Sequence, residues 1–445
     1  MEIKFANIWS TFRIFFKAAL VGALILLMLI PTFFIQNLVS ERAQRKQEAI
    51  TEISSRWAAS QTITGPVIGV PYMDVVTDNG NKVETKRWAY FLPSKLDIRS
   101  RLAPEKRYRG IYEVTVYTTD IDIHGSFDSL HLDELNLSPG TNMLWNEATV
   151  FVDISDLQGL KTDMTVHLKS ENTTTDLTLE PAHRTTEQFK TALSAPMPGW
   201  LKDNTAKSME FSATVKLKGS QNLSFVPVGR ETNVEAVSSW PDPSFTGSAL
   251  PDMRTVKDSG FVANWKVLAL NRKFPQQWRE GNYDLDNSAF GVSLIVPVDV
   301  YQQTTRSVKY AILVILLTFT AFLLIEWVYD KIIHSVQYVL VGFALCLFYT
   351  LLLSLSEYLG FNGAYALAAL ATITLIAWFV GSLLRSGRMS VFITLLLIIQ
   401  YGFVFTLIQL QDYALLMGSI GLFVTLATVM YFSRKIKWEK MPTTS

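Results

Sequence analysis

The chain has 445 residues, of which 49% are hydrophobic and only 18% are charged, a low charged fraction for a soluble protein. The apolar residues crowd into residues 18–39 and the last third of the chain, so the composition indicates a membrane protein. The net charge of +1 gives no signal for binding nucleic acid or another polyanion. Cys346 is the single cysteine, which excludes an intramolecular disulfide and a cysteine-based metal site and favours a bacterial envelope protein.

Residues 18–39 form the first apolar run, about as long as one bilayer crossing. Lys4, Arg13 and Lys17 precede it, so the positive-inside rule places residues 1–17 in the cytoplasm. A cleaved signal peptide is the alternative. The run is longer than a typical signal core and no small-residue cleavage site follows it, so we expect an uncleaved membrane helix.

Residues 40–308 are soluble in character and lie between the first and second predicted spans. Residues 40–60 look helical, as if the first span continued out of the membrane. Beyond them, apolar and polar residues alternate with period two in several short stretches, such as 111–117 and 211–218, separated by Gly, Pro and Asn turn signals. This pattern predicts a mainly-β, sandwich-like domain, which the orientation of the first span places in the periplasm.

Two predicted strands stand at opposite ends of this domain, residues 66–71 and 291–298. Each is tethered by a short connection to a neighbouring membrane span. We therefore expect the two strands to lie side by side.

Five further apolar runs of about 20 residues follow, which gives six spans in all. Lys and Arg recur in every second connection, so the positive-inside rule places both chain ends in the cytoplasm, with 433–445 as a cytoplasmic tail. The predicted spans of this helical bundle, residues 309–432, are 309–329, 336–356, 364–384, 389–409 and 413–432.

An aromatic, proline-punctuated loop is the best candidate for contact with a partner. It contains Trp240, Pro241, Pro243 and Phe245, and its two prolines restrict the backbone. The alternative, which is the commoner use of such loops, is that Trp240 and Phe245 are buried and close one end of the β domain together with Phe261, Trp265 and Trp278.

Two acidic residues are candidates for an intramembrane polar role. Glu326 lies near the predicted inner end of the second span, and Glu357 lies at the predicted outer end of the third. Ionisable residues in membranes often mark ion or substrate paths. The simpler interpretation is that both side chains reach an interface.

The sequence indicates no catalytic site, cofactor or metal site. It contains no phosphate-binding P-loop, no GxSxG nucleophile motif and no HExxH zinc motif. The histidines lack close ligand spacing, and surface positions explain them better than zinc does; they are His124, His131, His167, His183 and His334.

Several segments, spread over nearly the whole chain, resemble the CreD family of inner membrane proteins from Gram-negative bacteria. They are Gly65-Pro66 with Val70-Pro71, SSWPDPSFTGSALP at 238–251, SGF at 259–261, KYAILVILLTFTAF at 309–322, QYVLVGFALCLFYTLLLSLSE at 337–357 and MYFSRKIKW at 430–438. The resemblance implies a role in the envelope: a response regulon, tolerance to colicin and maintenance of envelope integrity. It implies no enzymatic activity or cofactor and supplies no functional residues.

We therefore expect a non-enzymatic protein of the bacterial inner membrane that supports envelope integrity and the envelope stress response through its periplasmic domain. Its expected partners are the lipid bilayer and other envelope proteins or components, not nucleic acid, and the sequence leaves the oligomeric state open. The alternatives are a transporter or lipid-handling protein, and a membrane-embedded enzyme acting on an envelope precursor. A deep polar cavity near Glu326 or Glu357 would favour the transporter, and a cleft with converging titratable groups would favour the enzyme.

Overall fold

The computed structural model shows two compact units, Met1–Lys46 with Val298–Ser445, and Gln47–Pro297. We call the first the helical unit and the second the β domain. The second unit lies within the range 40–308 predicted from the sequence. The described residues are 2–78, 81–130, 132–135, 137, 141–170, 173–181, 186, 188–189, 192–204, 208–279, 283–294, 300–329, 333–384, 387–410 and 413–433.

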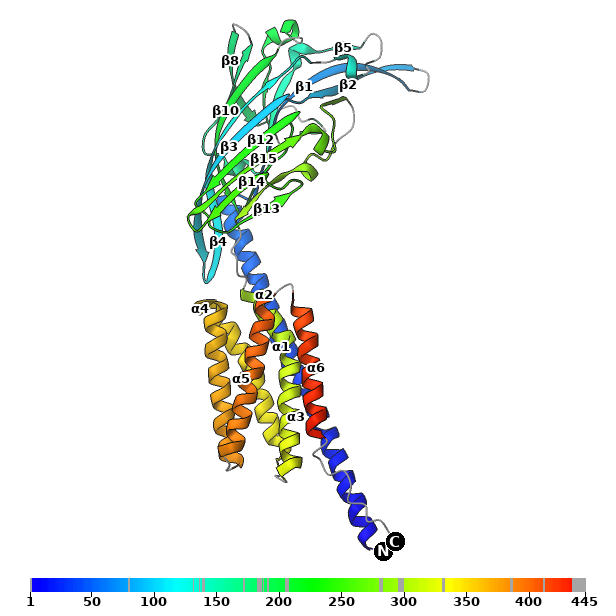
Figure 1. The fold of residues 1–445 in the computed structure, drawn as a ribbon. Helices are drawn as coiled ribbons and strands as arrows, with labels where there is room; N and C mark the ends of the chain where they lie inside the picture. The colour runs from blue at the N-terminus through cyan, green and yellow to red at the C-terminus, as the bar shows by residue number, and fades with distance from the viewer. Residues whose placement is uncertain are drawn as a thin grey trace. The chain divides into compact units, whose positions relative to one another are not determined.

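The helices form wherever the sequence carries long apolar runs (Figure 1). The first helix is longer than its apolar core, because the polar stretch after residue 39 continues it, as predicted. The α-helices of the described residues are α1 (Glu2–Trp57), α2 (Val300–Lys309), α3 (Ala311–Tyr329), α4 (Ser335–Leu384), α5 (Gly387–Gln409) and α6 (Ala414–Ser433).

Four helical stretches of the described chain are long and apolar enough to cross a membrane, not the six that we predicted. They are Phe16–Trp57, Val300–Trp327, Ser335–Leu383 and Gly387–Gln409. The difference has two causes. The predicted spans 336–356 and 364–384 both fall within α4, and the described apolar stretch of the last predicted span, Leu416–Thr428, is too short to qualify.

The helix α4 is not a straight rod. Along a straight α-helix, Phe348 and Tyr365 would lie roughly 25 Å apart. Their ring centroids are 5.3 Å apart, so the chain must reverse between them. Gly360 is the residue with non-helical angles, φ 69° and ψ 169°, a conformation that glycine adopts without steric cost. The helix α4 is therefore a hairpin of two helical arms, which Figure 1 also shows.

The described residues of the β domain form seventeen strands. Alternating side chains along most of them predict one buried and one exposed face, and β3 shows this alternation over its first nine residues. The strands are β1 (Gln61–Asp78), β2 (Asn81–Phe91), β3 (Lys95–Arg109), β4 (Tyr112–Phe127), β5 (Asn142–Met143), β6 (Thr149–Ile154), β7 (Met164–Ser170), β8 (Thr173–Pro181), β9 (Leu193–Pro196), β10 (Met209–Ser220), β11 (Asn222–Phe225), β12 (Glu231–Ser238), β13 (Pro243–Gly247), β14 (Met253–Lys257), β15 (Gly260–Leu268), β16 (Gln277–Arg279) and β17 (Phe290–Leu294).

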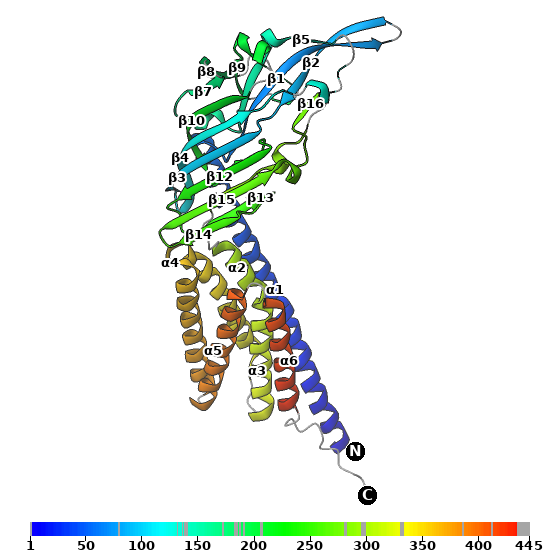
Figure 2. The ribbon, with the colours of Figure 1, turned by 45° about the horizontal axis from the view of Figure 1, so that its top comes forward.

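These strands form two sheets joined through β8, which pairs with β7 in one sheet and with β9 in the other. The polar sheet, as we name it, has the order β14-β15-β12-β3-β4-β10-β7-β8. Figure 2 shows β4, β3, β12, β15 and β14 side by side in this order. The second sheet is built around β1, which pairs with β2, β5, β6 and β11.

The buried faces of the two sheets meet in one core. The Tyr117 hydroxyl on β4 donates a hydrogen bond to the carbonyl of Asn222 on β11, 2.7 Å away. The ring of Trp265 on β15 lies 5.7 Å from that of Phe290 on β17. Two facing sheets with aromatic side chains between them make a sandwich-like domain, so the predicted mainly-β character is confirmed.

The predicted pairing of residues 66–71 with 291–298 is wrong in the part that the structure describes. Residues 61–63 of β1 run parallel to β11, and β11 pairs on its other side with β17. The four-residue strand β11 therefore lies between the start of β1 and β17, and residues 67–71 pair with β2 and β6 instead. Tethering to neighbouring spans, on which the prediction rested, does not determine which strand lies between two others. Residues 295–298 fall outside the described residues.

The last turns of α1 belong to the β domain and pack on it. Ile50 forms a small buried cluster with Val114 and Val116 of β4. Two cations lie against the Trp57 ring, the Arg107 guanidinium 4.1 Å and the Lys218 ammonium 4.7 Å from its centroid. These contacts determine where the chain enters the domain.

Candidate functional site

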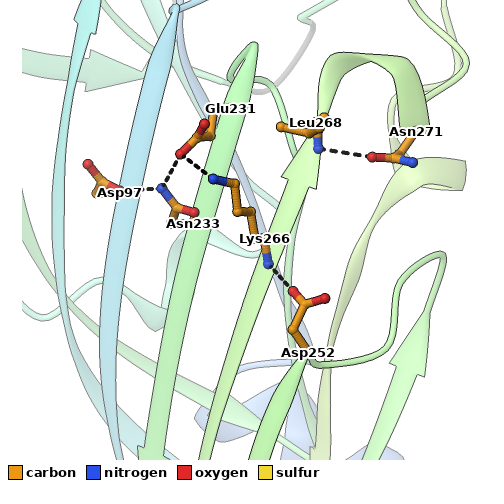
Figure 3. A network of polar contacts seen from close by, with 7 residues as sticks. All are labelled: Asp97, Glu231, Asn233, Asp252, Lys266, Leu268 and Asn271. Carbon is orange, nitrogen blue, oxygen red and sulfur yellow. Dashed lines mark hydrogen bonds and ion pairs between the residues drawn. The ribbon is translucent and has the colours of Figure 1, made fainter.

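The outer face of the polar sheet carries a network of charged and amide side chains (Figure 3). Asn233 on β12 donates from Nδ2 to Asp97 Oδ1 on β3 at 2.9 Å and to Glu231 Oε1 at 3.2 Å. Glu231 Oε1 also lies 3.1 Å from the ammonium nitrogen of Lys266 on β15. These residues alternate with buried ones along their strands, so the pleat directs them to one face.

The network joins three neighbouring strands through their side chains. The hydrogen bond from Lys266 and the second one from Asn233 lower the pKa of Glu231 below its ordinary value. Cross-strand pairs of this kind contribute modestly to sheet stability, and solvent screens this one. Asp252 extends the network, since its Oδ2 accepts a hydrogen bond from the backbone amide of Lys266 at 2.7 Å.

An open groove of about 1050 Å³ runs over the same face. Its wall carries both charge signs, and within the described part of the chain no group of three potential metal-ligating side chains occurs. The carboxylates of Asp97 and Glu231 are already engaged by their neighbours. The lining residues are Asp97, Ile98, Arg99, His124, Asn233, Val234, Glu235, Asp252, Met253, Asn264, Trp265, Lys266, Leu268 and Asn271.

Next to the groove, the sheet ends in what we name the edge hairpin, β14 and β15. Every residue of β14 is exposed. Met253 keeps 68% of its surface exposed and Val256 keeps 47%, and Leu250, just before the strand, keeps 68%. Met253 and Val256 point to opposite faces of the strand, so apolar side chains are exposed on both sides of this edge, where a partner could cover them. The edge hairpin is therefore the part of the β domain best suited to bind a partner.

The aromatic loop predicted from the sequence lies beside the edge hairpin, and its two rings pack within the β domain. Trp240 is only 7% exposed, and its Nε1 donates to the Asp242 carbonyl at 3.1 Å. Phe245 lies in β13, partly buried, with its ring 5.9 Å from Phe261 and 5.7 Å from Trp265. Pro241 is exposed, whereas Pro243 is half-buried at the start of β13.

Trp278, the other aromatic residue named with this loop, lies in a different cluster. Its ring packs against Tyr90 and Tyr283, at 5.2 Å and 5.4 Å. The loop and the three named aromatic residues therefore do not form a single site.

In the helical unit, Glu326 lies in an ion pair. Its Oε1 is 3.1 Å from Lys17 Nζ of α1, and its Oε2 accepts a hydrogen bond from the Tyr338 hydroxyl of α4 at 3.3 Å. Lys17 also donates to the Ile333 carbonyl at 2.6 Å. We call Lys17, Glu326 and Tyr338 the first junction. It joins α1, α3 and α4.

Glu357 lies in a second arrangement of the same residue types. Its Oε1 accepts a hydrogen bond from the Tyr301 hydroxyl of α2 at 3.1 Å. The Lys46 ammonium of α1 lies 6.0 Å from the centroid of the Tyr301 ring, a distance at which a cation is attracted to the ring face. We call Lys46, Tyr301 and Glu357 the second junction. Both candidate glutamates therefore take part in contacts that hold α1 to the rest of the helical unit.

Sequence reasoning did not single out the network or the edge hairpin. The alternation of Glu231, Asn233 and Glu235 along β12 was a usable signal, because it places all three on one face. The position of β14 at the edge of a sheet could not be predicted from the sequence, because the order of strands depends on pairings between distant segments.

Comparisons with known proteins agree with one another. The family described as "Inner membrane protein CreD" matches residues 13–439. A relative from Escherichia coli (strain K12), also described as "Inner membrane protein CreD", is 33% identical over 433 residues, which cover 96% of this chain and 94% of the relative.

Proposed function

The chain belongs to the CreD family of inner membrane proteins, and on that premise we propose that it supports the cell envelope without catalysing a reaction, through contacts made by its β domain. The family match covers nearly the whole chain, so both the membrane helices and the β domain belong to the family. The resemblance to this family links the protein to envelope integrity and to the envelope stress response.

The edge hairpin is the observation that carries this proposal. A sheet edge with exposed Leu250, Met253 and Val256 resembles a protein contact surface, because apolar area in such a place is stabilised when a partner covers it. The two membrane glutamates instead take part in the two junctions, which supports a structural use of the helical unit.

We further propose six membrane crossings, with both chain ends in the cytoplasm and the β domain in the periplasm. The hairpin in α4 supports this count, because each of its arms is about as long as one crossing. Alternating positive connections support the orientation. Alkaline phosphatase, which is active only in the periplasm, should be active when fused after Thr119, Gly360 or Gln411 and inactive after Gly387. Activity at Gly387 would overturn the arrangement.

The function is tested in a strain that lacks the gene. Leakage of a periplasmic enzyme and sensitivity to detergent measure envelope integrity, and the full-length protein should restore both. A variant with Leu250→Ser, Met253→Ser and Val256→Thr should accumulate normally and fail to restore them.

The matched control changes exposed apolar residues elsewhere in the domain, Tyr108→Ser and Ile111→Thr, and should restore the envelope. If the deletion leaves the envelope intact, or if the triple variant restores it as well as the native protein does, the proposed function is refuted.

A further inference from the structure

We propose that the free edge of β14 binds an extended polypeptide segment of another protein, one whose side chains carry acidic and apolar groups in a defined order. This inference rests on the proposed function and specifies the chemistry of the partner. It follows from the pairing, the exposure and the charges of a five-residue strand.

The edge of β14 is available for pairing. Within the described residues β14 pairs with β15 alone, from Met253 opposite Asn264 to Lys257 opposite Gly260. In an antiparallel ladder, alternate residues turn their amide and carbonyl groups away from the partner strand. Those groups face solvent here, since all of β14 is exposed. An added strand can satisfy them with main-chain hydrogen bonds.

Two cations on β14 have no ion-pair partner among the described residues, Arg254 and Lys257. The Arg254 guanidinium lies over the ring of Phe245, 5.9 Å from its centroid. An arginine held over an aromatic ring keeps donors free for a carboxylate. Acidic side chains on an added strand would complement both charges.

The sequence of β14 sets the pattern that its partner needs. Met253 and Val256 are exposed apolar residues, and each is followed directly by a cation, Arg254 or Lys257. Residues directly opposite each other on paired strands interact most strongly. The complementary segment therefore has apolar residues opposite Met253 and Val256, and acidic residues opposite Arg254 and Lys257.

A second copy of this chain fits the edge less well. In a parallel pair of two β14 strands each cation would face its own copy, and in an antiparallel pair centred on Thr255 Arg254 would face Val256 and Lys257 would face Met253. Neither arrangement gives the cations a counter-ion. The charges therefore favour an acidic segment of a different protein.

The test uses the full-length protein in lipid nanodiscs and fluorescent nine-residue peptides. The acidic peptides carry the core Glu-Val-Thr-Glu-Val for antiparallel pairing or Val-Glu-Thr-Val-Glu for parallel pairing, with serines at both ends. The basic peptides have lysine in place of glutamate. Fluorescence anisotropy measures binding at low ionic strength and again at high salt.

We expect an acidic peptide to bind and the basic peptides not to bind. The double variant Arg254→Glu with Lys257→Glu should bind the acidic peptide about tenfold more weakly, because two cross-strand attractions become repulsions. The same variant should gain binding of the corresponding basic peptide. Lys169→Glu, an exposed charge reversal on β7 that lies outside the groove lining, should bind as the native protein does.

Absence of acidic-peptide binding, or binding that the double reversal leaves unchanged, would overturn the proposal. A second measurement asks whether a second copy occupies the edge. Thr255→Cys should remain monomeric under oxidation in membranes, because no second copy occupies the edge. The native Cys346 is buried, so it does not compete as a crosslinking site. A quantitative crosslinked dimer would also overturn it.

The envelope assay separates this proposal from the proposed function. If the double reversal changes the preference from acidic to basic peptides, the docking site is supported whatever the envelope assay shows. If the same variant restores the envelope completely, the envelope role does not depend on this edge. A double reversal that abolishes peptide binding and also fails to restore the envelope supports both proposals.

Discussion

The Nζ atom of Lys17 lies 3.1 Å from Oε1 of Glu326, which joins the first helix to the third. Lys46, in the second junction, follows Lys17 on α1 by roughly 43 Å at 1.5 Å per residue. That length is close to the thickness of a bilayer with its headgroups. The helix α1 is thus held to the helical unit at two levels about one membrane apart, as part of the bundle.

Removing the negative charge of the first junction should destabilise the helical unit. In Glu326→Gln, Lys17 keeps the Ile333 carbonyl but loses its counter-ion. The two side chains are 21% and 13% exposed, so we expect a loss of about 1–2 kcal/mol, less than for a fully buried pair. Thermal unfolding in detergent measures the loss.

The exchanged pair Lys17→Glu with Glu326→Lys should recover most of that stability, and Lys309→Gln, at an exposed lysine of α2, should have little effect. Equal unfolding temperatures for the native protein and Glu326→Gln would show that the ion pair contributes nothing measurable.

Gly360 should be sensitive to a methyl group for conformational reasons alone. Its φ of 69° is unfavourable for other residues, while an added Cβ would have no atom within 4 Å. Gly360→Ala should therefore cost about 1 kcal/mol.

Gly363→Ala is the control for Gly360→Ala, since its Cβ would meet Leu359 at an ordinary 3.6 Å within a helix. This change should stabilise the helix by about 0.5–1 kcal/mol. The two substitutions should therefore shift the unfolding temperature in opposite directions, and a shift of the same sign would argue against the α4 hairpin.

Trp240→Ala should destabilise the β domain rather than impair a contact. The side chain is buried, and the loss of a buried aromatic ring costs about 3–5 kcal/mol. The variant should accumulate poorly in membranes and unfold at a lower temperature. Asp242→Ala, at an exposed neighbouring position, should change stability by less than about 0.5 kcal/mol. A Trp240→Ala protein that is as stable as the native one but fails to restore the envelope would instead identify Trp240 as a contact residue.

Acid should weaken the network on the polar sheet. The pKa of Glu231 is lowered in the folded protein. Its carboxylate therefore contributes to the free energy of unfolding above the ordinary pKa of 4.5, and this contribution disappears as the pH falls through the pKa of the folded state. The native protein should therefore unfold at a slightly higher temperature than Glu231→Gln at pH 7, and the difference should vanish in acid. A difference that persists unchanged in acid would show that another effect of the substitution dominates.

The sequence by itself determined the class of this protein, because its signals are local. A run of apolar residues about as long as a bilayer indicates a membrane helix whatever surrounds it, and alternation around residues 111–117 indicates a strand with one buried face. Even the helical continuation of α1 to Trp57 could be predicted from residues 40–60. The family resemblance rested on equally local segments.

Only the tertiary structure decided which distant residues meet. Strand order depends on pairings across long stretches of chain, so β11 could separate β1 from β17 without any local sign, and β14 could become an edge. Glu326 and Glu357 looked alike as isolated acids near membrane ends, and their partners Lys17 and Tyr301 come from other helices. Alternation shows which face a residue occupies, but the fold determines what that face meets, because packing is a relation between segments that the local sequence does not encode.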